Sequence, residues 1–260
     1  MDIVKGEKIF SLRELLYNML PLDYFVVLYS VLYIVSPYIN LAINRLSEKQ
    51  FRKMVILMFV IFSVWSFGVD VLNNVFEKSV NHASPIGIQG SQGGYTIINF
   101  ILVYIIGAYI RKSGTKMSSK KASLYFVVIL VLLYALSVYA YKSDWGDTLF
   151  WKYNNPFVIM ASALVLIVFL GFRYESKIIN ELARGVFTCY VSHKILLEYF
   201  DIEKAVNQNL GILFLHQLLT ALIIYFISYL FHITYRVCSS IFLTSIRPLC
   251  DKINISLDYK

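Results

Sequence analysis

The side chains best suited to chemistry lie within one apolar segment, CYVSHKILLEYF, at residues 189–200. Ionisable groups inside an apolar span cost free energy and tend to be kept for a function. His193 lies near the middle of this span, and Tyr190 shares its helical face because the two residues are three positions apart. An imidazole accepts and returns protons near neutral pH. His193 is therefore the candidate catalytic residue.

Two interpretations of this segment stay open. In the structural interpretation, Glu198 neutralises Lys194, four residues away, and His193 makes a single hydrogen bond between helices. In the catalytic interpretation, His193 takes up and releases a proton for a reacting group.

Four more polar residues fall in or beside apolar segments. His216 and His232 are separated by more than about four turns of one predicted helix, so they cannot act at one point along it. We interpret each of these histidines as a contact between helices. Asp23 and Asp70 stand at the ends of spans, where water is available, and we interpret them as boundary residues.

Composition predicts the fold that holds these residues in place. The chain is 58% hydrophobic and 15% charged, whereas a soluble domain carries about a quarter charged residues. Apolar stretches of roughly 17 to 25 residues, long enough to cross the bilayer as helix, alternate with short charged loops. The predicted fold is all-α, a polytopic transmembrane helical bundle with about seven spans. These are expected near residues 22–43, 54–69, 95–110, 122–141, 156–172, 185–200 and 210–237.

The composition of the chain outside the spans predicts the ends of the transmembrane domain and one long loop. Residues 1–20 carry apolar side chains at helical spacing and predict an amphipathic segment at the membrane interface. The transmembrane domain is expected over 21–245 and a cytoplasmic tail over 246–260. Residues 70–94 are rich in turn-forming residues and poor in charge, so we expect no regular structure there.

Charge predicts orientation. The net charge of +8 comes from Lys and Arg that gather mostly in the loops after the first, third, fifth and seventh spans. Cytoplasmic loops are positive, so the N-terminus is predicted outside and the C-terminus in the cytoplasm. The basic loop at 111–121 fits this rule, and attraction of an anionic cytoplasmic donor is the alternative. A nucleic-acid partner is not expected, since the cations follow the span ends.

Cysteines indicate neither a disulfide framework nor a metal site. Cys189, Cys238 and Cys250 are an odd, scattered set without a CxxC pair, which is unlike either pattern.

Four apolar motifs, in order, resemble one known family. They are YFVVLYSVLYIVSPYINLAINRLSEKQFRKMV at 24–55, GGYTIINFILVYIIGAYIRK at 93–112, NNPFVIMASALVLIVFLGF at 154–172 and IINELARGVFTCYVSHKILL at 178–197. Their order, spacing and predicted sidedness are similar to those of the membrane acyltransferase family 3 proteins. In the last motif a Tyr, two residues and a His recur, which places His193 at the family's histidine.

The resemblance implies a function. Members are bacterial enzymes of the plasma membrane that O-acetylate capsular and other exported polysaccharides, with acetyl-CoA as the cytoplasmic acyl donor and no metal. The partners it implies are the lipid bilayer and a polysaccharide or lipid-linked glycan acceptor. Members usually have ten spans, and the first carries a basic residue followed by a catalytic His. Nothing ahead of Tyr24 can form three spans, so the sequence is expected to be the C-terminal portion of such an enzyme.

Two alternatives remain. One is a catalytically inactive remnant of the same family, because the N-terminal His motif is absent from this sequence. The other, from a different class, is a polysaccharide flippase or polymerase membrane subunit, which has the same hydropathy.

Overall fold

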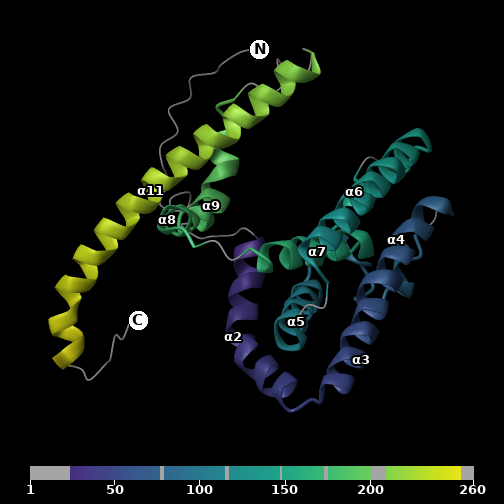
Figure 1. Cartoon of the computed structure of the whole chain (residues 1–260), viewed down its shortest axis with the longest axis horizontal. Coiled ribbons are helices and arrows are strands. Elements are labelled where there is room, and N and C mark those ends of the chain that lie inside the picture. The colour runs from purple at the N-terminus through teal and green to yellow at the C-terminus, as the bar shows by residue number, and fades with distance from the viewer. Residues whose placement is uncertain are drawn as a thin grey trace. The chain divides into compact units, whose positions relative to one another are not determined.

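The computed structural model describes residues 24–76, 79–114, 117–146, 148–172, 175–200 and 209–252. Regular structure in this part of the chain is entirely helical, which confirms the all-α class (Figure 1). The helices form two compact units, residues 1–173 and 174–260. Four helical stretches are long and apolar enough to cross a membrane: Tyr24–Asn44, Glu48–Val75, Ser119–Lys142 and Gly211–Ile241.

Each predicted span coincides with a helix. The first unit contains α2 (Tyr24–Asn44), α3 (Glu48–Phe59), the π-helix η1 (Val60–Trp65), α4 (Ser66–Val75), η2 (Asn81–Ala83), η3 (Gln92–Gly94), α5 (Ile97–Ser113), α6 (Ser119–Lys142), η4 (Leu149–Trp151) and α7 (Pro156–Leu170). The second contains α8 (Lys177–Ala183), α9 (Val186–Leu197) and α11 (Leu210–Lys252).

Two boundaries differ from the prediction. The second span continues through α4 to Val75, so the expectation of no regular structure from residue 70 to 94 is wrong, and η2 and η3 lie within the same stretch. The helix continues because polar side chains near its end are held by hydrogen bonds, including Asn74 Nδ2 to Asp70 O at 2.8 Å. The last helix extends to Lys252, into the predicted tail. Residues 1–20 and 253–260 lie outside the described residues.

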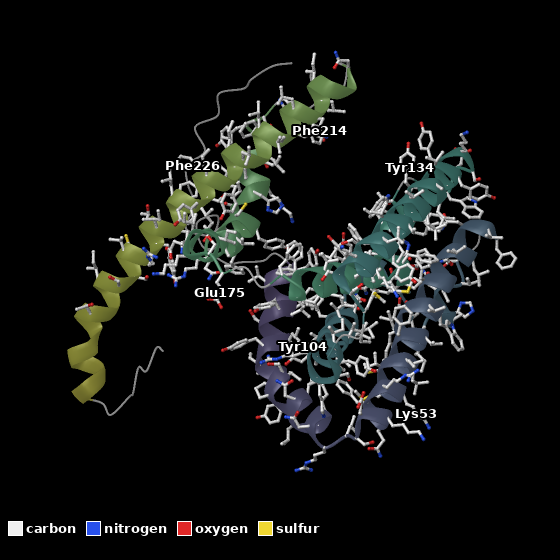
Figure 2. The ribbon with its side chains drawn as sticks, in the orientation of Figure 1. Lys53, Tyr104, Tyr134, Glu175, Phe214 and Phe226 are labelled. Atoms are coloured by element: carbon white, nitrogen blue, oxygen red, sulfur yellow. The ribbon has the colours of Figure 1, made fainter. Side chains whose placement is uncertain are left out.

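Apolar side chains cover the outside of both units. Many large apolar and aromatic residues on the long helices are exposed, and Figure 2 labels Tyr134 on α6 and Phe214 and Phe226 on α11. Exposed apolar side chains in this number are unfavourable in water but are stable in contact with the hydrocarbon core of a bilayer. This exposure agrees with helices that face lipid.

The proline in α2 does not end the helix. Pro37 lacks an N–H, which leaves the Tyr33 carbonyl without its usual helical donor. The Ser36 hydroxyl donates to that carbonyl at 2.9 Å, and serine side chains are among the groups that compensate prolines in membrane helices. The span therefore continues unbroken from Tyr24 to Asn44.

A lysine connects α5 to the end of α2. Lys112 Nζ donates to the Ile43 carbonyl at 2.9 Å and to the Leu46 carbonyl at 3.4 Å, and it lies 5.6 Å from the centre of the Phe51 ring. Below it, Ile43, Phe51 and Ile105 form one buried cluster. A cation at a helix C-terminus stabilises the unpaired carbonyls there. This contact gives one residue of the basic loop a structural role.

A second cluster joins α4, α6 and η4. Phe67, Leu133, Ala140, Leu149 and Phe150 are buried together. Phe67 and Phe150 pack edge to face with their ring centroids 5.8 Å apart. The loop that follows η4 is thereby held against α4, next to the start of α7.

Gly94 allows the loop before α5 to contact the loop before α7. Its φ is +88°, and a Cβ there would lie 2.5 Å from Asn154 N and 2.8 Å from the Tyr153 carbonyl carbon. The Tyr153 N–H donates to Gly93 O at 2.9 Å across the same contact. Only glycine combines this backbone angle with this approach.

We predict that Gly94→Ala destabilises the first unit by more than Gly114→Ala does. Both glycines have positive φ, so each alanine bears a backbone strain of about 1–3 kcal/mol, but a Cβ at Gly114 meets nothing within 4 Å. The thermal midpoint of the detergent-solubilised protein measures the difference. Equal midpoints for the two variants would contradict the close contact at Gly94.

Candidate functional site

His193 lies on α9 with its ring held by its own helix. The Nδ1 atom is 2.5 Å from the Tyr190 carbonyl oxygen, and the two rings lie 5.6 Å apart between centroids. A carbonyl only accepts, so Nδ1 carries the hydrogen in this contact. In the neutral ring, Nε2 then holds the lone pair that can accept a proton.

The helix α11 packs against α9 through small and polar side chains. The hydroxyl groups of Ser192 and Ser228 are 2.7 Å apart, and Ser228 is fully buried. Gly185, at the start of α9, lies so close to Tyr229 that a Cβ would be 2.7 Å from its ring. Small residues allow helices to approach closely in membranes. The two helices therefore meet along a narrow seam.

Polar contacts near α8 extend this seam. Glu181 binds Arg236 of α11 at 2.6 Å and Arg184 at 2.8 Å, and the Tyr225 hydroxyl donates to the Leu182 carbonyl. These contacts fix the longitudinal register of α11 against the α8–α9 segment.

A cavity of about 500 Å³ opens between α9 and α11, within the second unit. His193, Tyr190 and Cys189 line it from α9, and His216, Gln217 and Thr220 line it from α11. Most of the remaining lining is aliphatic or aromatic, so the cavity suits a small apolar group with polar atoms at one position.

His216 shares this cavity with His193, which the sequence interpretation missed. His216 and His232 do lie too far apart on α11 to act together, but the partner of His216 is on the other helix. His193 stands eight residues before position 201 and His216 eight after position 208, so antiparallel packing of α9 and α11 brings them to one level. The equal spacing of the two histidines from residues 201–208 is the sequence pattern from which this pairing could have been predicted. His232 is not among the residues that line the cavity and stacks on Tyr229 at 6.2 Å.

The His216 ring has an unsatisfied nitrogen. Its Nδ1 is buried and has no hydrogen-bond partner among the described residues. Leaving a buried polar atom unpaired costs about 1–3 kcal/mol. Nε2 of His232 on the same helix is unpaired as well, so His216 is distinguished by its place in the cavity lining. Two imidazoles on one cavity can accept a proton at one ring and donate at the other.

The first unit contains a separate buried polar cluster around Asp70. Asp70 is 4% exposed, so its interpretation as a boundary residue in water is wrong. Its Oδ2 accepts from Ser91 Oγ at 2.6 Å and from Asn154 Nδ2 at 3.0 Å, and Lys152 Nζ lies 3.6 Å away. Burial of a carboxylate is tolerated when hydrogen bonds and a cation compensate it.

A metal site is not evident in the described residues. No group of three His, Cys, Asp or Glu side chains is placed to hold a metal there. Cys189 and Cys238 are free thiols. Pairing of Lys194 with Glu198 stays a prediction.

Comparison with known proteins gives one match. A family model described as an acyltransferase domain matches residues 14–243. Searches of curated proteins and of solved structures gave no match. The matched range includes both histidines of the cavity and the Asp70 cluster.

We predict that Ser192 and Ser228 are energetically coupled. A double-mutant cycle with Ser192→Ala, Ser228→Ala and the double variant should give a coupling of about 0.6 kcal/mol, the average for hydrogen bonds between membrane helices, and at most about 1.7 kcal/mol. Reversible unfolding in mixed micelles measures it. Ser162→Ala serves as a control, because that hydroxyl bonds only to its own helix at Val158 O; additive effects of the Ser192 and Ser228 changes would contradict the contact.

Proposed function

The chain belongs to the acyltransferase domain family, and we propose that it is a membrane-bound O-acetyltransferase acting on capsular or other exported polysaccharide. In this proposal the donor is acetyl-CoA and the membrane is the bacterial plasma membrane. The observation that carries the proposal is His193, whose Nδ1–H is engaged by Tyr190 so that Nε2 can act as a base in the cavity.

Acetyl transfer requires a base beside an acyl-sized space. An acceptor hydroxyl attacks the thioester carbonyl carbon while His193 Nε2 takes the hydroxyl proton. The thiolate of the donor then leaves, and the same imidazolium returns the proton to it. The product is an O-acetyl ester and a free thiol, so the protein ends unchanged. The largely aliphatic lining between α9 and α11 suits the acetyl group and excludes competing water.

His216 has a complementary role in this proposal. Negative charge develops on the thioester oxygen during attack, and a positioned N–H donor stabilises it. The imidazole of His216, on the facing helix, can present an N–H for that purpose. Antiparallel packing of α9 and α11 supports this role because it brings His216 to the level of His193.

Two alternatives make different predictions. An inactive family member leaves O-acetylation of the surface polysaccharide unaffected by its deletion. A flippase or polymerase subunit affects the amount or length of the polymer rather than its acetyl content.

We predict that His193→Ala lowers O-acetylation by about 10²–10⁴-fold, because the general base is lost. The measurement is the O-acetyl signal in the proton NMR spectrum of the surface polysaccharide, in a deletion strain complemented with each variant at matched abundance. His232→Ala is the control, since that histidine is on α11 but not among the cavity residues.

The outcomes separate the two levels of the proposal. Acetyl signals that survive deletion of the gene would remove the acetyltransferase function itself. Signals that vanish on deletion but persist with His193→Ala would remove only the site. Shortened or missing polymer would instead favour the flippase or polymerase alternative.

We also predict that His216→Ala lowers kcat by about a hundredfold, as loss of one such donor does. KM for acetyl-CoA should change little, because the interaction forms as charge develops rather than in the bound substrate. A membrane assay of acetyl transfer at varied donor concentration measures both constants. An unchanged kcat with a raised KM would assign His216 to binding instead.

A further inference from the structure

A second cavity of about 500 Å³ lies where α4 and α6 end, wholly within the first unit. Its lining differs from that of the His193 cavity, because amide, hydroxyl, carboxylate and indole groups converge there. The residues that carry the inference are Asn73, Asn74, Asn81, Asp144 and Trp145.

Hydrogen bonds hold the amide groups in place. Asn73 Nδ2 donates to Asn81 Oδ1 at 2.7 Å, and Asn73 Oδ1 accepts from the Val80 N–H at 2.7 Å. Asn74 donates to the Asp70 backbone carbonyl at 2.8 Å, which connects this cavity to the buried Asp70 cluster. Each primary amide has two N–H groups and two acceptor lone pairs, so these bonds orient the amides without exhausting their capacity.

The indole of Trp145 is also held rigidly. It packs against the buried cluster of Phe67, Leu133 and Ala140 and meets Tyr139 edge to face at 5.5 Å. Beside it, Asp144 is exposed and has a left-handed backbone, with φ of +57°. A fixed aromatic ring beside fixed amides and a carboxylate presents one apolar surface and several directed hydrogen-bonding groups.

That combination matches a sugar ring. Pyranose rings have an apolar C–H face that stacks on an aromatic ring and a rim of hydroxyl groups that pair with amides and carboxylates. The described residues that line the cavity include a carboxylate and no lysine or arginine, which disfavours a phosphate or an anionic lipid headgroup.

Its location agrees with an exported ligand. The ends away from the cavity are the more basic ones: they carry Lys49, Arg52 and Lys53 on α3, which continues through η1 into α4, and Lys120 and Lys121 on α6, whereas the cavity end of α6 carries Lys142. By the positive-inside rule those ends are cytoplasmic and the cavity faces outside.

We propose that this cavity binds a sugar unit of the acceptor polysaccharide, an inference that rests on the proposed function and deepens it. Trp145 stacks on the ring, Asn73 and Asn74 pair with its hydroxyls, and Asp144 accepts from one more. The cavity thus supplies acceptor recognition that the apolar His193 cavity does not.

The test is direct binding, measured by calorimetry without acetyl-CoA. The probe is a set of oligosaccharide fragments from the surface polysaccharide of the cell that encodes the chain, stripped chemically of O-acetyl groups. Trp145→Ala on the purified full chain should raise Kd about tenfold or more, as removal of a central aromatic contact does. Trp151→Ala is the matched control, since Trp151 lies in the nearby η4 but is not among the cavity residues.

Asp144→Asn guards against misfolding, because asparagine tolerates the left-handed backbone and the residue is exposed. It should weaken binding by several-fold while the thermal midpoint stays unchanged. Absence of fragment binding to the wild-type chain, equal loss in the two tryptophan variants, or displacement of fragments by phosphatidylglycerol vesicles would each overturn the proposal. Binding that persists while deletion leaves acetylation intact would keep the sugar site and remove the acetyltransferase function.

Discussion

The first unit depends on the compensation of one buried charge. Asp70 lies within α4, in the last third of a long membrane helix, and its carboxylate is shared among Ser91, Asn154 and Lys152. Removing one partner of a buried ionic group costs about 3–5 kcal/mol, far more than the pair contributes relative to an apolar replacement. The carboxylate therefore specifies the arrangement of its partners more than it adds stability. Three chain segments that are distant in sequence converge because this single group must be paired.

Other features of the unit follow from that convergence. The loop around Ser91 reaches Asp70 only if Gly94 takes a positive φ and lies against Tyr153 and Asn154. Ser63 of η1 donates to the Asn154 carbonyl at 2.8 Å, so a second hydrogen bond joins the loop before α7 to the same helical span. Asn155 then caps α7 by accepting from the Phe157 N–H at 2.9 Å. The first N–H groups of α7 would otherwise lack acceptors, and the short loop before α7 supplies one.

Much of the helical framework could be predicted from the sequence, because apolar length alone determines where a chain can cross a bilayer. Pro37 does not interrupt this framework, because the Ser36 hydroxyl donates to the carbonyl that the proline leaves without its helical donor. The burial of Asp70 could not be predicted, since its partners lie 21 and 84 positions away in the chain and local hydropathy carries no information on them. His216 was missed for a related reason. The sequence interpretation compared His216 only with His232 on the same helix. The neighbour of His216 is His193, and packing of α11 against α9 brings these two together.

The π-helix η1 at Val60–Trp65 has a consequence for how this family member can change. A π turn accommodates one more residue than an α turn, and such segments cluster at functional sites. Relaxing these residues into regular α geometry, with none removed, would rotate everything beyond them by about 100°. Asp70 would then point away from its partners, although no contacting residue had been altered. The π turn thus sets the rotation of the second half of this span, and with it the direction in which Asp70 points.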